Sequence, residues 1–264
     1  MLTEAKNQLK ISMLSVKYAI MREMLNKTTF LTNIIFMILN NAGFIIQWVV
    51  LYSLKDSVGG YTFKQVMLLW AIAASSYGIA HFFFKKAFEL ADIINTGKLD
   101  SFLVQPKNVL LSAITTDVDT SALGDILYGF LILFICGTTP FNLLLFIVFS
   151  MCSGFILVSL SVIFSSLSFW FSKTDLLADT TNRLMTNFAT YPDGIFKGAV
   201  KVMLFTIIPV GITTYIPVKL LTNFNINFFM IIILVTIVLV TLAFIIFNKG
   251  LKRYSSSNLM SARV

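Results

Sequence analysis

The chain has 264 residues, of which 57% are hydrophobic and 12% are charged, and its formal net charge is +8. A soluble domain carries about 25% charged residues, and the mean hydropathy here is +0.87. So large an apolar surplus cannot be hidden in one water-soluble core. The composition therefore excludes an ordinary soluble domain and indicates that lipid surrounds much of the chain.

Uncharged runs long enough to cross a membrane follow one another along the sequence. A helix needs about 20 residues to span the hydrocarbon core. The run 126–172 is too long for one crossing, and Gly137 and Pro140 divide it because both residues interrupt helices. We therefore predict an all-α membrane protein with six crossings, near residues 29–51, 65–84, 119–136 and 141–171, then a fifth between 173 and 224, and a sixth at 228–247.

The fifth crossing has two candidate positions. Hydropathy favours 202–218 (the window 200–218 at its widest), but Pro209 interrupts it and removes a backbone donor. The pieces 199–208 and 210–217 would instead dip into the membrane and return, and Pro192, Pro209 and Pro217 would mark the turns of a re-entrant outer region, 193–222. The fifth crossing would then be 175–191, where Asp179 and Arg183 are four residues apart and could pair. We favour this re-entrant arrangement.

The distribution of Lys and Arg predicts the orientation. If both termini are cytoplasmic, most of the 20 Lys and Arg residues lie in the inner segments 1–28, 85–117 and 249–264. This bias follows the positive-inside rule for a multi-pass protein of the cell membrane. The net charge is then explained by topology and by contact with anionic lipid, and nucleic acid is not an expected partner.

The first 28 residues predict an amphipathic helix that lies along the inner membrane surface. Apolar residues recur at steps of three and four, beside lysines on another face. The apolar stripe consists of Leu9, Met13, Val16, Ile20 and Met24. A loosely ordered tail is the alternative.

The cytoplasmic loop 85–117 contains the pattern of a helix, a stop and a second short helix. Gly97 stands where a helix would end in a left-handed residue. After it, Leu99, Phe102 and Leu103 recur at helical spacing until Pro106 ends the run. A short helix with an apolar face in such a loop is suited to docking on another protein, and we expect these three side chains to face that partner.

Three stretches resemble ATP-binding-cassette (ABC) exporter permeases of the ABC-2 type. GKLDSFLVQP (residues 97–106) is similar to the family segment G-x-L-[ED]-x-L-L-x-x-P. The Pro-interrupted stretch 191–221 is similar to the outer region before the last helix of that family. FNKGLKRYSSSN (247–258) resembles the tail of a small six-helix subgroup, although Phe247 stands where a Trp is usual.

The resemblance implies a single permease domain over 1–264 that works with separate ATPase subunits. The coupling segment that touches the ATPase would comprise Gly97, Lys98, Leu99, Asp100, Phe102, Leu103 and Pro106. A second copy or a related permease would complete a dimer, and ATP and Mg would bind to the partner ATPase. The chain itself has no G-x-x-x-x-G-K-[ST] loop, so we expect no cofactor on it and no enzymatic activity of its own.

An ATP-independent carrier or channel is the alternative function. A membrane-embedded enzyme would need clustered His, Asp, Glu or Cys, and a single His is present. The substrate stays open, and the frequent Lys and Asn indicate a bacterial source.

The most notable polar residue within a predicted span is Asp125, because an ionisable group in lipid costs about 2.5–3.5 kcal/mol. It would line a pathway or pair with another helix, as would Asp179 and Arg183 if they are intramembrane. Asp117 and Asp119 are interpreted as the solvated start of the third span. Cys136 and Cys152 match no metal motif and are assigned to packing.

Overall fold

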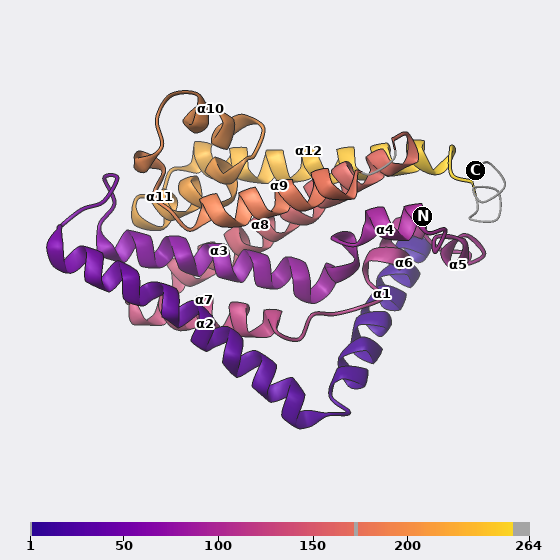
Figure 1. Cartoon of the computed structure of the whole chain (residues 1–264), viewed down its shortest axis with the longest axis horizontal. Coiled ribbons are helices and arrows are strands. Elements are labelled where there is room, and N and C mark those ends of the chain that lie inside the picture. Colours follow the sequence, from indigo (N-terminus) through magenta and orange to yellow (C-terminus); the bar gives the residue numbers. More distant parts are fainter. Residues whose placement is uncertain (1, 172–173, 256–264) are drawn as a thin grey trace.

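The computed structural model describes residues 2–171 and 174–255, and this part of the chain is helical without any strand (Figure 1). The last residues of the predicted tail, 256–264, and Lys173 lie outside the described residues. The α-helices are α1 Leu2–Glu23, α2 Lys27–Leu54, α3 Phe63–Phe84, α4 Leu90–Asn95, α5 Asp100–Leu103, α6 Val109–Ile114, α7 Ala122–Ile135, α8 Pro140–Ser166, α9 Asp175–Ala189, α10 Gly198–Thr206, α11 Ile216–Thr222 and α12 Ile226–Leu251.

Four stretches in the described ranges are long and apolar enough to cross a membrane. They are α2, α3 with its continuation to Asn95, α8 with its continuation to Phe169, and α12. A fifth is obtained if α10 and α11, which are bent by 75° against each other, are counted as one broken span. The multi-pass helical architecture predicted from the uncharged runs is therefore confirmed.

The third predicted span is shorter than expected. α7 is an apolar helix of 14 residues that begins at Ala122, not at Asp119. The carboxylate of Asp119 accepts hydrogen bonds from the backbone N–H and the hydroxyl of Ser121, at 3.0 and 2.6 Å. This local turn competes with the helix for the same backbone donor, which explains the later start.

The long helices run between two ends of the molecule. α1 begins and α12 ends at the right of Figure 1, beside α4, α5 and α6, and we call this the loop end. The opposite end holds α10, α11 and the connection between α2 and α3, and we call it the hairpin end. α7 and α9 run towards the hairpin end, and α3, α8 and α12 run back. α2 begins at the bottom of Figure 1, where it follows α1, and also runs to the hairpin end.

The centre of the bundle is formed by α3 and α8. α3 packs on α7 and α8, while α12 packs on α8 and α2 packs on α7. Gly129 of α7 brings this helix so close to α3 that a Cβ there would collide with Ser75. Most of α3 and α8 is buried, whereas α2 and α12 expose long rows of Leu, Ile and Phe. Such exposed faces suit contact with lipid tails or with a second transmembrane subunit.

The region between α9 and α12 stays at the hairpin end. Pro209 separates α10 from a π-helical turn, Gly211–Tyr215, and Pro217 lies in the first turn of α11. Leu204 is the one buried residue of α10, whereas Val218 and its neighbours in α11 are buried against α3 and α8. The bent backbone is therefore covered by protein on its inner side, which lipid requires of any irregular segment at its depth.

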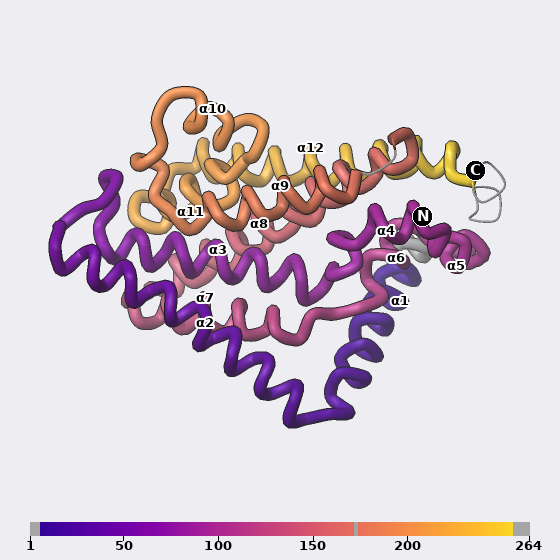
Figure 2. The backbone as a smooth tube through the Cα atoms, viewed as in Figure 1, coloured from indigo at the N-terminus to yellow at the C-terminus, as the bar shows by residue number. Residues whose placement is uncertain are grey.

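The N-terminal segment forms the predicted helix, which ends at Glu23 before a sharp turn into α2 (Figure 2). Leu9 and Met13 are exposed, at 63% and 66%, whereas Ala19 is buried against the rest of the chain. The first part of the expected apolar stripe thus points away from the bundle, where it is free to contact a membrane surface, whereas Val16 and Ile20 are half-buried.

Candidate functional site

The predicted docking loop forms a compact group of short helices at the loop end. α4 buries Leu90, Ile93 and Ile94 against α8 and α9. Gly97 then adopts the left-handed conformation that the sequence predicts, with φ of 75°. α5 makes one turn and packs on α6. We call residues 97–106 the loop tip.

The side chains of the loop tip do not all face outward. Leu99 is fully buried and Phe102 is half-buried, whereas Leu103 and Val104 are 43% and 84% exposed. The expectation that Leu99 faces a partner is therefore wrong. A helix of one turn is unstable alone, so its first apolar residue anchors it to the chain. The exposed apolar surface is shifted to Leu103 and Val104.

Polar contacts join the loop tip to the last helix. The hydroxyl of Tyr254, which follows α12, donates a hydrogen bond to Asp100 at 2.9 Å, across 154 residues. Burial and then this bond to a carboxylate raise the pKa of Tyr254 to about 12. Lys98 pairs with Asp92 of α4 at 2.9 Å. Two of the stretches that carry the resemblance, 97–106 and 247–258, thus meet in space.

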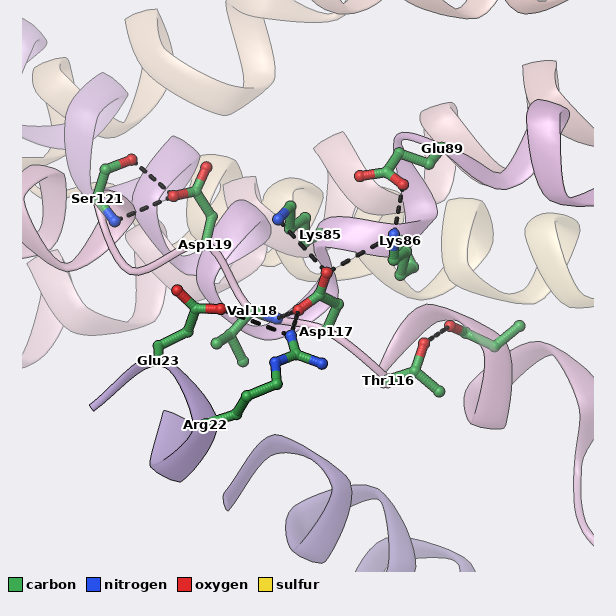
Figure 3. Close-up of polar contacts among 11 residues, drawn as sticks. Arg22, Glu23, Lys85, Lys86, Glu89, Thr116, Asp117, Val118, Asp119 and Ser121 are labelled. Atoms are coloured by element: carbon green, nitrogen blue, oxygen red, sulfur yellow. Dashed lines mark hydrogen bonds and ion pairs between the residues drawn. The ribbon is translucent and has the colours of Figure 1, made fainter. Parts of the chain in front are cut away.

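Asp117 joins α1 to the start of the loop (Figure 3). Its Oδ1 accepts a hydrogen bond from Arg22 Nη2 at 2.5 Å. Its Oδ2 lies 3.4 Å from Lys85 Nζ and 3.6 Å from Lys86 Nζ. Partial burial opposes ionisation, but Lys85, the backbone N–H of Val118 and Arg22 outweigh it, so the pKa of Asp117 lies below its usual range. Asp117 is therefore a half-buried ion-pair centre and not the solvated helix start that we expected.

A second contact fixes the other end of α1. The backbone N–H of Asn108, between the loop tip and α6, donates to Gln8 Oε1 at 2.9 Å. The sequence offered no signal for this contact or for the Arg22 pair, because the partners are about a hundred residues apart. α1, the loop tip and the end of α12 are consequently linked into one unit at the loop end.

The comparison with known protein families agrees with this architecture. Residues 37–258 match the profile of the family described as "ABC-2 family transporter protein", which is most of the chain. The chain belongs to this family. No curated protein and no solved structure matches the chain. As an ABC-2 permease, it is a membrane component of an ABC transporter.

The permease contains a cavity of about 560 Å³ between α2, α3 and α9. Asp125 of α7 lies at its wall, is 4% exposed, and accepts a hydrogen bond from Asn41 Nδ2 of α2 at 2.6 Å. Both roles that the sequence left open for Asp125 are thus compatible with its position. Within residues 2–171 and 174–255, no cluster of His, Cys, Asp and Glu is placed to hold a metal ion.

The other predicted polar pair does not form. Asp179 and Arg183 are both exposed on α9, and the ion pairs of the described residues include none between them. The α9 residues that face the cavity include Met185 and Asn187 instead. The four-residue spacing allows a pair but does not enforce it, because both side chains are exposed.

At the hairpin end of the permease, Asp193 joins segments that are far apart in the sequence. Its side chain is 7% exposed, and its carboxylate accepts a hydrogen bond from the Tyr61 hydroxyl at 2.6 Å. The Nζ atoms of Lys201 and Lys219 lie 3.3 and 3.5 Å from the carboxylate oxygens. Burial opposes ionisation, but these partners outweigh it, so the pKa of Asp193 lies below its usual range. Sequence reasoning missed this cluster, although Pro192 marks the turn that places it.

Proposed function

We propose that this permease forms the transport pathway of an ATP-driven exporter. It works as a homodimer or heterodimer with separate ABC ATPase subunits, which bind ATP and Mg and contact the loop tip. The chain crosses the cell membrane six times, through α2, α3, α7, α8, α9 and α12, and both termini are cytoplasmic. In this arrangement the loop end faces the cytoplasm, and α10 with α11 forms the re-entrant hairpin.

The observation that carries the proposal is the exposed apolar tip on a well-anchored loop. Leu103 and Val104 project from the end that holds both termini, while the buried Leu99 holds the turn to the chain. The topology is supported by the course of residues 190–225, which leave and rejoin the bundle at the hairpin end. α9 is then available as the fifth crossing.

The loop tip is in direct contact with the helices of the bundle, so these contacts can transmit a force applied at the tip. Leu99 belongs to the same packed core as residues of α3 and α8, and Asp100 is bonded to Tyr254 behind α12. Closure of two ATPases on ATP would push the tips of two permeases. The spans would then tilt as rigid helices and open a pathway between the subunits, since packed helices move as units.

Co-purification of a co-expressed ABC ATPase tests the docking assignment. The double variant L103D/V104D should lose most of the bound ATPase, because each carboxylate would have to be buried without a partner. The matched control is L176D/L177D, which places the same two charges on exposed apolar residues at the start of α9. Full ATPase recovery with L103D/V104D, or transport by the purified permease without any ATPase, would contradict the proposal.

A further inference from the structure

The cavity between α2, α3 and α9 is built from regular helix faces. The α2 residues Met37, Asn40, Asn41 and Phe44 and the α3 residues Trp70, Ala73, Ala74 and Tyr77 both follow steps of three, one and three. Each set therefore forms one continuous stripe of its helix. In Figure 1, α3 lies between α2 and α9, the other two helices that line the cavity. The cavity is a feature of the packing of whole helices.

Asp125 is the one acidic residue among those that line the cavity, and Lys, Arg and His are absent from the described lining. Its Oδ1 accepts from Asn41, whereas its buried Oδ2 has no hydrogen-bond partner within the described residues. At the neighbouring Gly124, a Cβ would lie 2.6 Å from the carbonyl oxygen of Ile34, so α2 and α7 touch at this level. The carboxylate is therefore confined by protein on that side.

A purely structural role does not require a carboxylate at this position. An Asn or Ser could accept the same hydrogen bond from Asn41 without the cost of an ionisable group in a span, about 2.5–3.5 kcal/mol. Buried charges are normally paired. The described lining supplies no cation, so a cation that enters the cavity would balance the carboxylate, which a proton would otherwise neutralise.

The remaining lining matches an aromatic or apolar ligand body. The rings of Phe44 and Trp70 stack at 5.3 Å between centroids, and Tyr77 lies about two helical turns further along α3. Ring faces attract organic cations within about 6 Å of their centroids. Asn187 and Thr190 of the α9 end add neutral hydrogen-bonding groups.

We infer that this cavity binds organic monocations, with Asp125 as the countercharge and the aromatic side chains around the ligand body. The inference rests on the proposed function in one respect, since the ligand would be the class of compound that the permease exports. An anion of the same shape is rejected, because the carboxylate repels it in a poorly screened environment.

The test measures binding of two ions of the same shape and opposite charge to the purified permease in lipid nanodiscs, with empty nanodiscs as the blank. Tetraphenylphosphonium should bind saturably and change the tryptophan fluorescence. Tetraphenylborate, titrated separately because the two ions pair with each other, should show no saturable binding above the blank. D125N should weaken phosphonium binding about thirtyfold or more, equivalent to about 2 kcal/mol. D119N, which changes a carboxylate outside the cavity lining, should bind as the wild type does.

Two further results distinguish a ligand-binding role of Asp125 from a purely structural one. D125E keeps a carboxylate at this position, so it should retain more phosphonium binding than D125N does. If D125N fails to fold, the discrimination between the two ions by the wild type still decides the question. Equal binding of both ions, no saturable binding, or wild-type affinity in D125N would overturn the inference. ATPase co-purification is measured independently, so the transporter assignment can survive that failure.

Discussion

The two ends of the permease are each held by one carboxylate that joins distant segments, but in different surroundings. Asp193 at the hairpin end is 7% exposed and bonds to the buried hydroxyl of Tyr61. Asp117 at the loop end is 16% exposed, and its closest partner, Arg22, is 58% exposed. The hairpin end is therefore held by a desolvated hydrogen bond in addition to ion pairs, and the loop end by ion pairs that water and salt can weaken.

This difference suits a transporter that is driven from one side. The proposed ATPase acts at the loop end, where α1 and the loop tip need to shift relative to the bundle. Contacts of exposed ions contribute little and re-form easily. The hairpin end, by contrast, has to keep the bent α10–α11 backbone covered while the helices tilt. The predictions below test whether the two ends really differ in this way.

The largest effect is expected for Gly194→Ala at the hairpin end. A Cβ on Gly194 would collide with the backbone carbonyl of Gly59 in the α2–α3 connection, and backbone atoms cannot move aside as a flexible side chain would. We expect a loss of about 3 kcal/mol in the free energy of unfolding, the upper range for overpacking. Reversible unfolding in mixed detergent micelles measures it.

Gly43→Ala is the matched control, because a Cβ on this α2 residue meets nothing within 4 Å. It should leave the free energy of unfolding unchanged or raise it slightly, since Ala favours the helix. If both glycine variants unfold alike, the close contact between the α2–α3 connection and Asp193–Ile195 does not hold the hairpin end.

A smaller loss is expected for Tyr61→Phe. The variant removes one hydrogen bond to the carboxylate of Asp193 and leaves the lysines in place. A hydrogen bond to a charged group contributes about 1.5–3 kcal/mol. We expect a loss of about 2 kcal/mol, measured in the same unfolding experiment.

Tyr52→Phe provides the comparison, because the Tyr52 hydroxyl donates at 2.7 Å to a neutral carbonyl, that of Tyr61. The Tyr52→Phe variant should lose about 1 kcal/mol in the free energy of unfolding. A Tyr52 variant that is as damaging as the Tyr61 variant would show that the charge of Asp193 adds nothing at the hairpin end.

The sequence predicts the parts of this architecture that depend on local pattern. Uncharged runs locate α2, α3, α8 and α12, and the Gly97 position follows from the end of a helix pattern. The contacts that hold the two ends do not follow from any pattern, because Arg22 and Asp117 are 95 residues apart and Tyr61 and Asp193 are 132 apart. Charged residues in connections have no period, so only the fold selects their partners.

The prediction of which loop-tip side chains face a partner failed for a related reason. Helical spacing predicts Leu99, Phe102 and Leu103 on one side of a turn, but it does not say which of them meets a partner and which meets the chain's own core. The structure buries Leu99 and exposes Leu103. The cavity could be predicted from the sequence only in part. Its α2 and α3 stripes are visible in the sequence as steps of three and four, yet Asn41 and Asp125 are 84 residues apart.

The smallest effect is expected at the loop end, for Arg22→Gln. The variant should loosen α1 by about 0.5 kcal/mol, the range of exposed ion pairs. The measurement is the rate of proteolysis in the turn at residues 24–26. About 1 M salt should accelerate cleavage of the wild type to the rate of the variant and leave the variant unchanged. Lys98→Gln removes an exposed ion pair that does not touch α1, so this variant should be cleaved at the same rate as the wild type.

Acid provides an independent way to release the same contact. Because the folded-state pKa of Asp117 is depressed, its ion pairs stabilise the loop end above the unfolded pKa of about 3.9 and are lost as the pH falls through the folded value. Proteolysis of α1 should therefore stay constant from pH 8 to about pH 5 and rise only below about pH 4. An increase near pH 6 would point to a different titrating group and would remove Asp117 as the centre of this contact.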